Sequence, residues 1–423
     1  MSEWERVRLD EVIALDVDAV PVTATASYDI VGVLNRGRGL LFRDPIAGDE
    51  TSYKTLNRIR PNQIVYSRLK AFEGAITVAP NDLGEVYGSQ EFPTFTCGEQ
   101  MLPDYFRLLT TTNRLWEQLQ ALSTGMGGRR ERVKPADFLT IEVARPSLSE
   151  QRRIVDVMAA VNAHIESIRL ERENAAEAVR RARLALLTVG FGGAWESEIT
   201  DSHTSLTWTD QLPAGWRSEK IGGVSVVRSG ATPRRSEKAR YFDGGSIPWV
   251  KTGDLNERVI TKTDECITDA GFSESSVRLL PAGTVLVAMY GGFAQIGRTA
   301  SLGVASTTNQ AISAITDLRA DVLPSYLHHA LKAGRPKWRL VAASSRKDPN
   351  VSKRDIEDFD FPLPSPDEQR EIVDVLGFME FAVDEFTAEL ANLRAFRSAL
   401  LASLLNQEIE IPESYDALLE GVS

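Results

Sequence analysis

The chain has 423 residues, of which 43% are hydrophobic and 25% are charged, and its formal net charge at pH 7 is −11. This length exceeds what one hydrophobic core usually serves, so two or more domains are expected, and the composition excludes a disordered or fibrous protein. No apolar run approaches the roughly 20 residues that cross a bilayer, and the first residues lack the basic and apolar regions of a signal peptide. We therefore expect a cytoplasmic protein without a membrane partner.

The acidic charge is unevenly distributed along the chain. Residues 364–423 carry 3 Lys and Arg against 13 Asp and Glu, a net charge of −10. Residues 210–363 carry 21 Lys and Arg against 17 Asp and Glu, a net charge of +4. Because local patches rather than the net charge decide whether a protein binds nucleic acid, the overall acidity does not exclude DNA.

Residues 1–145 are predicted to form a β-rich domain. Short β-type runs are broken by Gly, Pro and Asn, and Ile64–Tyr66 and residues 75–78 are predicted strands on either side of a loop. A helix-like segment lies near residues 102–122.

Residues 146–192 are predicted to form the first long helix. Its start, PSLSEQRRIVDVM at 146–158, recurs as PSPDEQREIVDVL at 364–376, with nine of thirteen positions identical. Ser147 and Ser365 are each followed three residues later by a glutamate, which is the pattern of a capping box. A fixed internal period of this kind indicates a repeated architecture.

Apolar residues follow both starts at alternating steps of four and three, with Arg172 and Arg397 as the breaks. Five or so heptads favour a coiled coil over ordinary surface helices. The alternative of two unrelated amphipathic helices does not explain the shared start and register. The seam residues are Ile154, Met158, Val161, Ile165, Ile168, Ala175, Val179, Ala182, Leu186 and Val189, then Ile372, Leu376, Met379, Val383, Phe386, Leu390, Leu393, Leu400 and Leu404.

A Ser/Thr/Asp-rich connector at 193–209 leads to a second predicted β-rich domain at 210–363. This domain repeats features of the first: Trp216 and Ile221 have the spacing of Trp4 and Leu9, and a Leu-Pro-x-Tyr sequence at 323–326 matches the one at 102–105. The second long helix is predicted at 364–406, and an acidic tail at 407–423 ends the chain.

No catalytic motif is found in the sequence. No lysine follows a glutamate by two positions, and neither the Gly-rich phosphate loop GxxxxGK[ST] nor the methyltransferase motif Asn/Asp-Pro-Pro-Tyr/Phe occurs. The four histidines and two cysteines have no metal-ligand spacing. We therefore expect no enzyme active site, no metal and no cofactor.

Basic and amide side chains recur in loops at matching places of both domains. Arginine can bind phosphate or the guanine edge with two donors, and Asn and Gln suit adenine. A single such loop is more often a solvated turn, and the recurrence favours a DNA role. The candidates are Arg36, Arg38, Arg68, Lys70, Arg129 and Arg130 in the first domain, and Arg234, Arg235, Lys251, Gln295, Arg298, Asn309, Gln310, Arg346 and Lys347 in the second.

Together these features resemble the specificity subunit of Type I restriction–modification enzymes. The resemblance covers nearly the whole chain and rests first on the repeated helix start. In the second domain it also rests on Leu212-Pro213-x-Gly215-Trp216, Ser229-Gly230-Ala231-Thr232-Pro233, Ile247-Pro248-Trp249 and Thr308-Asn309-Gln310-Ala311. The first domain lacks the Gly-Thr-Pro and Ile-Pro-Trp elements.

The resemblance implies an α+β fold of two pseudo-repeated β-rich target recognition domains, each followed by a long helix, with the two helices paired as an antiparallel coiled coil. It implies a non-catalytic subunit that reads a split target in double-stranded DNA and carries two methyltransferase subunits and the restriction subunits. We expect these subunits to contact Glu150, Gln151, Arg152, Glu368, Gln369 and Arg370. The alternative function is a coiled-coil adaptor whose β-rich domains bind proteins and not DNA.

Overall fold

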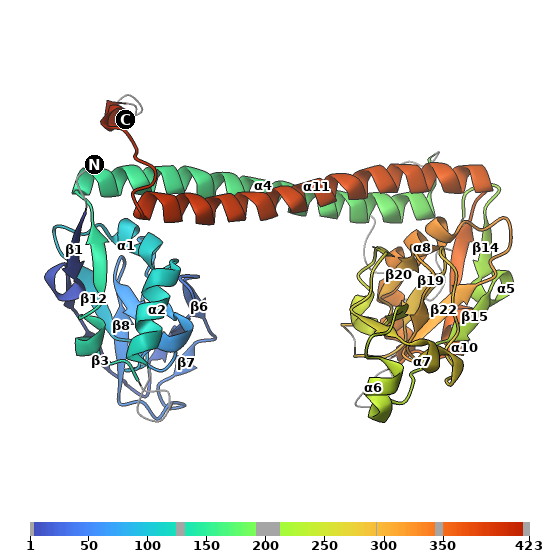
Figure 1. Cartoon of the computed structure of the whole chain (residues 1–423), viewed down its shortest axis with the longest axis horizontal. Helices are drawn as coiled ribbons and strands as arrows, with labels where there is room; N and C mark the ends of the chain where they lie inside the picture. Colours follow the sequence, from blue (N-terminus) through green and yellow to red (C-terminus); the bar gives the residue numbers. More distant parts are fainter. Residues whose placement is uncertain (1–3, 124–131, 192–211, 293, 343–349, 418–423) are drawn as a thin grey trace. The chain divides into compact units, whose positions relative to one another are not determined.

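The computed structural model describes residues 4–123, 132–191, 212–292, 294–342 and 350–417. The chain divides into two compact units: unit 1 comprises Met1–Ile168 with Glu389–Ser423, and unit 2 comprises Arg169–Ala388. The two longest elements, α4 (Leu148–Thr188) and α11 (Pro366–Leu405), each contribute one part to each unit (Figure 1).

Besides its parts of the two long helices, the described residues of unit 1 form short strands and three short α-helices. The strands are β1 (Glu5–Arg8), β2 (Ile13–Leu15), β3 (Asp18–Pro21), β4 (Ser27–Tyr28), β5 (Val31–Val33), β6 (Leu40–Phe42), β7 (Ile46–Ala47), β8 (Thr55–Ile59), β9 (Ile64–Tyr66), β10 (Ile76–Val78), β11 (Val86–Gly88), β12 (Thr94–Cys97) and β13 (Glu142–Arg145), and the helices are α1 (Pro103–Leu109), α2 (Asn113–Leu122) and α3 (Pro135–Phe138). All these strands pair antiparallel, and the two largest sheets have the orders β10-β9-β12-β2 and β11-β8-β3.

The helix predicted near residues 102–122 is divided into α1 and α2 by three threonines. The hydroxyls of Thr110, Thr111 and Thr112 donate to backbone oxygens of α1, at 2.7–2.8 Å. The Thr112 hydroxyl also accepts the Leu115 N–H and caps α2. Because side chains of this type compete with the backbone for hydrogen bonds, they favour a helix end over a helix interior.

The core of unit 1 joins the β-rich part to both long helices. Tyr66 stacks on both Phe95 and Phe138 in this core, and all three rings are buried. The same core includes Ile154 and Met158 near the start of α4 and Leu401 and Leu404 near the end of α11. The start of one long helix therefore packs with the end of the other, which makes the pairing in unit 1 antiparallel.

Unit 2 has a five-stranded sheet of order β15-β22-β19-β20-β17 and a three-stranded sheet of order β18-β16-β21. Its strands are β14 (Arg217–Lys220), β15 (Val226–Ser229), β16 (Ile247–Val250), β17 (Val259–Ile260), β18 (Glu265–Ile267), β19 (Val285–Ala288), β20 (Thr299–Leu302), β21 (Thr307–Thr308), β22 (Ile312–Thr316) and β23 (Asp360–Leu363), and its short helices are α5 (Ile221–Val224), α6 (Lys238–Tyr241), α7 (Asp269–Ser273), α8 (Pro324–Ala333), α9 (Trp338–Ala342) and α10 (Lys353–Asp358).

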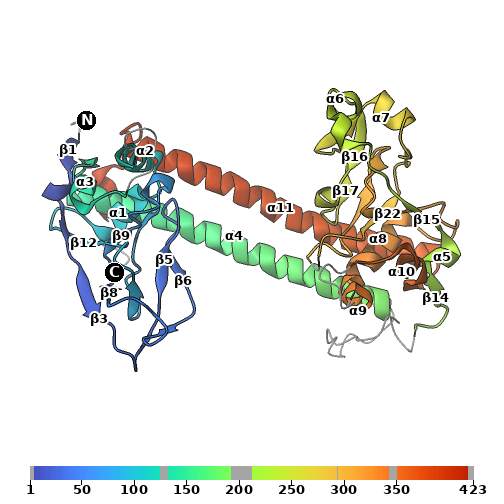
Figure 2. The ribbon, with the colours of Figure 1, turned by 90° about the horizontal axis from the view of Figure 1, so that it is seen from below.

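The main core of unit 2 again includes both long helices, here through Leu186 and Leu187 of α4 and Ile372 and Leu376 of α11. The end of α4 thus packs with the start of α11, and the pairing is antiparallel in this unit also. A smaller core around Trp249 holds β16 and β18 together with α6 and α7, which lie to one side of the five-stranded sheet in Figure 2.

The predicted fold class is confirmed. Each β-rich part closes with its first strand paired to its last, β1 with β13 and β14 with β23, and the last strand leads into a long helix. Arg397, predicted as a break in the seam, is half-buried, and its Nε donates to Asn162 Oδ1 at 2.6 Å. The predicted limits of the domains, the connector and the tail stay predictions. Among the described residues, no helix has the length and apolar character needed to cross a membrane.

Candidate nucleic-acid interface

Two parallel strands bring distant candidate residues of unit 2 to one edge. Lys251 and Asn309 directly follow β16 and β21, which are parallel neighbours that pair Val250 with Thr308. The backbone N–H of Asn309 donates to the Val250 oxygen at 3.0 Å. Because the carboxyl ends of parallel strands meet at one edge of a sheet, Lys251, Asn309 and Gln310 lie close together.

The loop after β15 is fixed to the same edge. The Ala231 N–H donates to the Thr308 oxygen at 2.9 Å, and Trp249 Nε1 donates to the Ala231 oxygen at 3.2 Å. The hydroxyl of Thr232 donates to Gln310 Oε1. A Cβ at Gly230 would lie 2.1 Å from a backbone oxygen, so this close approach of the loops requires glycine.

The loop between β19 and β20 reaches the same end of unit 2. The Met289 N–H donates to the oxygen of Ala311 at 2.8 Å, and the Ala288 N–H donates to that of Arg298, also at 2.8 Å. Gln295 and Arg298 therefore belong to this end. We call it the polar end of unit 2, defined by Arg234, Arg235, Lys251, Glu265, Gln295, Arg298, Asn309 and Gln310.

Arg235 and Lys251 are both bound to Glu265, which the sequence analysis did not single out. Arg235 Nη1 and Nη2 donate to the two Glu265 carboxylate oxygens at 3.1 and 2.8 Å. Lys251 Nζ lies 3.3 Å from Glu265 Oε2. The hydrogen bonds from Arg235, followed by those from Lys251, lower the pKa of the Glu265 carboxyl to about 2.

The Arg235 guanidinium is also held by two aromatic rings. Its central carbon lies 4.4 Å from the centroid of the Phe242 ring and 4.8 Å from that of Trp249. Since each terminal nitrogen donates one N–H to Glu265, the end-on two-pronged edge of Arg235 is engaged within the chain. The side chain of Arg234, by contrast, is 82% exposed.

In unit 1, two loops carry the candidates Arg36, Arg38 and Lys70. The backbone N–H of Arg36 donates to the Gly74 oxygen at 2.6 Å, which joins the loops. The Arg36 guanidinium lies over the ring of Trp116, 5.2 Å from its centroid. All three basic side chains are exposed, whereas Arg68 is half-buried and its Nε is buried without a hydrogen bond. Arg129, Arg130, Arg346 and Lys347 lie outside the described residues.

The two glutamines predicted to contact partner subunits are wholly buried, in matching positions. Gln151 Oε1 accepts the Leu102 N–H at 2.9 Å, and its Nε2 donates to the oxygens of Gln100 and Pro146 at 2.9 and 3.0 Å. The amide therefore ties the start of α4 to the loop before α1.

Gln369 repeats this arrangement at the start of α11. Its Oε1 accepts the Leu323 N–H at 2.9 Å, and its Nε2 donates to the oxygens of Asp321 and Pro364 at 2.8 and 3.0 Å. Both amides are fully engaged within the chain. This corrects the prediction for Gln151 and Gln369: their side chains are not available to a partner subunit.

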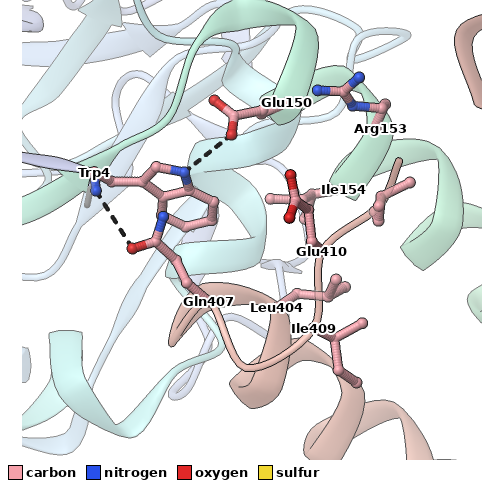
Figure 3. A pocket seen from close by; sticks show the side chains of 9 residues that line it. Trp4, Glu150, Arg153, Ile154, Leu404, Gln407, Ile409 and Glu410 are labelled. Atoms are coloured by element: carbon pink, nitrogen blue, oxygen red, sulfur yellow. Dashed lines mark hydrogen bonds between the residues drawn. The ribbon is translucent and has the colours of Figure 1, made fainter. Parts of the chain in front are cut away.

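The glutamate that precedes each glutamine bonds to a tryptophan. Trp4 Nε1 donates to Glu150 Oε1 at 3.2 Å, and Trp216 Nε1 donates to Glu368 Oε2 at 3.0 Å. Ser147 and Glu150 also form the predicted capping box, and Ser365 Oγ accepts the Glu368 N–H. Figure 3 shows the contact between Trp4 and Glu150, where the backbone N–H of Trp4 also donates to Gln407 Oε1 at 3.3 Å. Arg152 and Arg370 are exposed and stay partner-binding predictions.

The polar end lies inside a segment that matches a known protein family. Residues 213–388 match the family model described as Type I restriction modification DNA specificity domain. The MjaIX specificity subunit of Methanocaldococcus jannaschii is 28% identical over 194 residues, which is 45% of this chain and 42% of the relative. The chain is similar to the specificity subunits of Type I restriction enzymes.

Other relatives match more of the chain at lower identity. The StySPI specificity subunit of Salmonella potsdam is 21% identical over 322 residues, 73% of this chain and 65% of the relative. The matches with these two relatives span less than two-thirds of the relatives' own lengths. A solved structure concerning complex assembly and conformational transition of the type I R-M system contains a chain with a TM-score of 0.62 and 21% identity, covering 96% of this chain and 98% of that one. The likeness to this solved structure shows a shared fold.

Within the part of the chain that the structure describes, no group of three or more His, Cys, Asp or Glu side chains is placed to hold a metal ion.

Proposed function

We propose that the chain is the non-catalytic subunit that selects the DNA sequence in a Type I restriction–modification complex. It would read a split target in double-stranded DNA, with unit 2 reading one half and unit 1 the other. The proposal rests on the polar end of unit 2. There, four separate loops bring amide and basic side chains together inside the segment that matches the DNA specificity family.

The side chains of the polar end suit different parts of DNA. Asn309 and Gln310 carry the paired donor and acceptor that match adenine in the major groove, each good bidentate pair being worth about 1–3 kcal/mol of discrimination. Arg234, whose side chain is exposed, supplies positive charge for phosphates, which favours all sequences alike. In unit 1, Arg36, Arg38 and Lys70 offer a corresponding basic surface.

The two long helices would act as the spacer between the two half-sites. At 1.5 Å per residue, the 41 residues of α4 and the 40 residues of α11 make rods of about 60 Å. Their pairing within both units supports a stiff connection, and sequence choice would then reside in loops carried by a constant scaffold.

Two methyltransferase subunits, joined by restriction subunits, are the proposed protein partners. One observation supports a protein contact on α11: Val375, Phe378 and Phe381 are spaced by three residues and are 40%, 77% and 60% exposed. Residues three apart lie on the same face of a helix, and exposed apolar side chains that gather on one face are typical of interaction sites.

The partner surface is tested by co-purification with a methyltransferase subunit. Phe378→Ser together with Phe381→Ser should reduce the captured methyltransferase subunit at least tenfold and leave the melting temperature within a few degrees of the wild type. Leu279→Ser serves as the control, because Leu279 is also exposed, at 53%, but lies outside α11. Undiminished capture by the double variant would exclude this surface.

DNA reading is tested by a salt-dependent mobility shift with the chain assembled with methyltransferase subunits. Asn309→Ala should weaken target binding and leave binding to unrelated duplex unchanged, because Asn309 is assigned to a base. Arg234→Ala should weaken both by a similar factor, because Arg234 is assigned to a phosphate. Lys220→Ala is the control: Lys220 lies on β14 and pairs with Asp358 at 3.0 Å. If the assembly bound target and unrelated DNA equally, the proposed function would be wrong.

A further inference from the structure

We infer that Glu265 determines how selective the polar end is, by withholding Arg235 and Lys251 from DNA phosphates. The inference rests on the proposed function, because it concerns the way unit 2 binds DNA. It assigns a role in DNA specificity to an acidic residue, on a surface where only the basic and amide side chains would be expected to affect DNA binding.

The position of Glu265 is fixed by the sheet. It is the first residue of β18 and pairs with Trp249 of the neighbouring strand β16. Trp249 in turn is buried and anchors the loop after β15 through its hydrogen bond to Ala231. The backbone of Glu265 is therefore fixed by strand pairing beside the smaller core of unit 2, and the residue does not lie in a loop.

The two cations are held on this carboxylate from different loops. Arg235 approaches from the loop after β15 and binds both oxygens, and Lys251 approaches from the end of β16. Exposed ion pairs are usually weak, but a bidentate Arg–carboxylate pair whose guanidinium also lies over two aromatic rings has a defined geometry. The side chains of Arg235, Glu265 and Lys251 are 46%, 28% and 32% exposed, so the group faces solvent and can meet DNA.

The arrangement changes the balance between the two kinds of DNA contact. Phosphate contacts raise affinity for every sequence, whereas base contacts raise it for the target only. With Glu265 ionised, the three side chains together carry a charge of +1 instead of +2, and each terminal nitrogen of Arg235 already donates one N–H to Glu265. Non-specific affinity is then reduced, while the base contacts proposed for Asn309 and Gln310 are unaffected, so the ratio of specific to non-specific affinity increases.

The test is the salt dependence of binding to an unrelated duplex, measured with wild-type chain and Glu265→Gln, each assembled with methyltransferase subunits. A freed cation that contacts one phosphate adds about 0.9 to the slope of log affinity against log salt. With two freed cations the slope should steepen by about 1.8. Between 50 and 200 mM salt the variant should then lose about 12-fold more affinity than the wild type. At 50 mM salt it should bind the unrelated duplex more tightly.

Two further variants isolate the cause. Glu219→Gln makes the same change in net charge and removes an ion pair with Arg319, whose atoms lie 2.8 Å apart. The backbone N–H of Arg319 donates to the oxygen of Val224, which lies just before the first residue of β15. The polar end lies after the last residue of β15, so Glu219 and Arg319 are at the opposite end of this strand. The slope for Glu219→Gln should equal that of the wild type. Arg235→Gln leaves Glu265 paired with Lys251, so its slope should not steepen.

Each outcome has a distinct meaning. A steeper slope for Glu265→Gln alone, with an unchanged melting temperature, supports the inference. An unchanged slope for Glu265→Gln overturns it, as does a loss of target binding with an unchanged slope, which would make Glu265 a direct contact to a base. Failure of the wild-type assembly to prefer any sequence would contradict the proposed function instead. If Glu265→Gln failed to fold, Glu265→Ser would carry the same test.

Discussion

The buried glutamines at the helix starts should be essential for stability. Gln369→Leu keeps the volume of the side chain but leaves three backbone groups without their partner: the Leu323 N–H and the oxygens of Asp321 and Pro364. A buried polar group that loses its partner costs about 1–3 kcal/mol. The variant should therefore lose at least about 3 kcal/mol, a large part of the about 5–15 kcal/mol that stabilises a typical domain.

Urea unfolding followed by circular dichroism measures this loss. Gln151→Leu should behave in the same way, because Gln151 makes the equivalent three hydrogen bonds in unit 1. Gln90→Leu and Gln310→Leu are matched controls, since both of these glutamines are exposed, and each should change the free energy of unfolding by less than about 0.5 kcal/mol. A Gln369→Leu variant as stable as these controls would refute the role assigned to the buried amides.

Leu390→Asp should lower the free energy of unfolding by several kcal/mol, because Leu390 is only 4% exposed and an aspartate there would be a buried charge without a partner. The control Phe396→Asp, at a 54% exposed position of α11, should lower it little. Equal urea midpoints for the two variants would contradict the burial of Leu390. The protein should also lose stability in mild acid. Burial holds the pKa of His328 and His329 well below their usual range, so below about pH 6.5 the unfolded chain binds protons that the folded chain does not. The free energy of unfolding should therefore fall by up to about 1.4 kcal/mol per pH unit for each histidine, and His328→Asn with His329→Gln should reduce the difference measured between pH 7.5 and 5.5.

Local sequence rules predicted the scaffold well. The capping boxes and the apolar seam depend on residues three to seven positions apart, and the structure has Ser147, Glu150 and the buried seam residues Ile154 and Met158 as expected. The role of Gln151 could not be read in the same way, because its partners Gln100 and Leu102 lie about 50 residues earlier. The signal was present as a shared Leu-Pro-x-Tyr sequence before each repeat, but nothing in either segment alone indicates that they touch.

The candidate interface also depends on contacts between residues that are far apart in the sequence. Residue type selected Lys251, Asn309 and Gln310 individually, and their proximity follows from the parallel pairing of β16 with β21 across a long separation in sequence. Glu265 was missed because a single acidic residue in a strand has no motif, and only the folded chain places it against Arg235 and Lys251. The prediction for Arg235 depended on this missing neighbour.

We propose that each unit reads its own half of a split target. Replacing residues 210–363 by the corresponding segment of a related specificity subunit, and then mapping methylated sites in host DNA, is the decisive experiment. One half of the methylated sequence should change, while the other half and the spacing between them should be retained. If both halves changed, or neither did, the two units would not read the target independently.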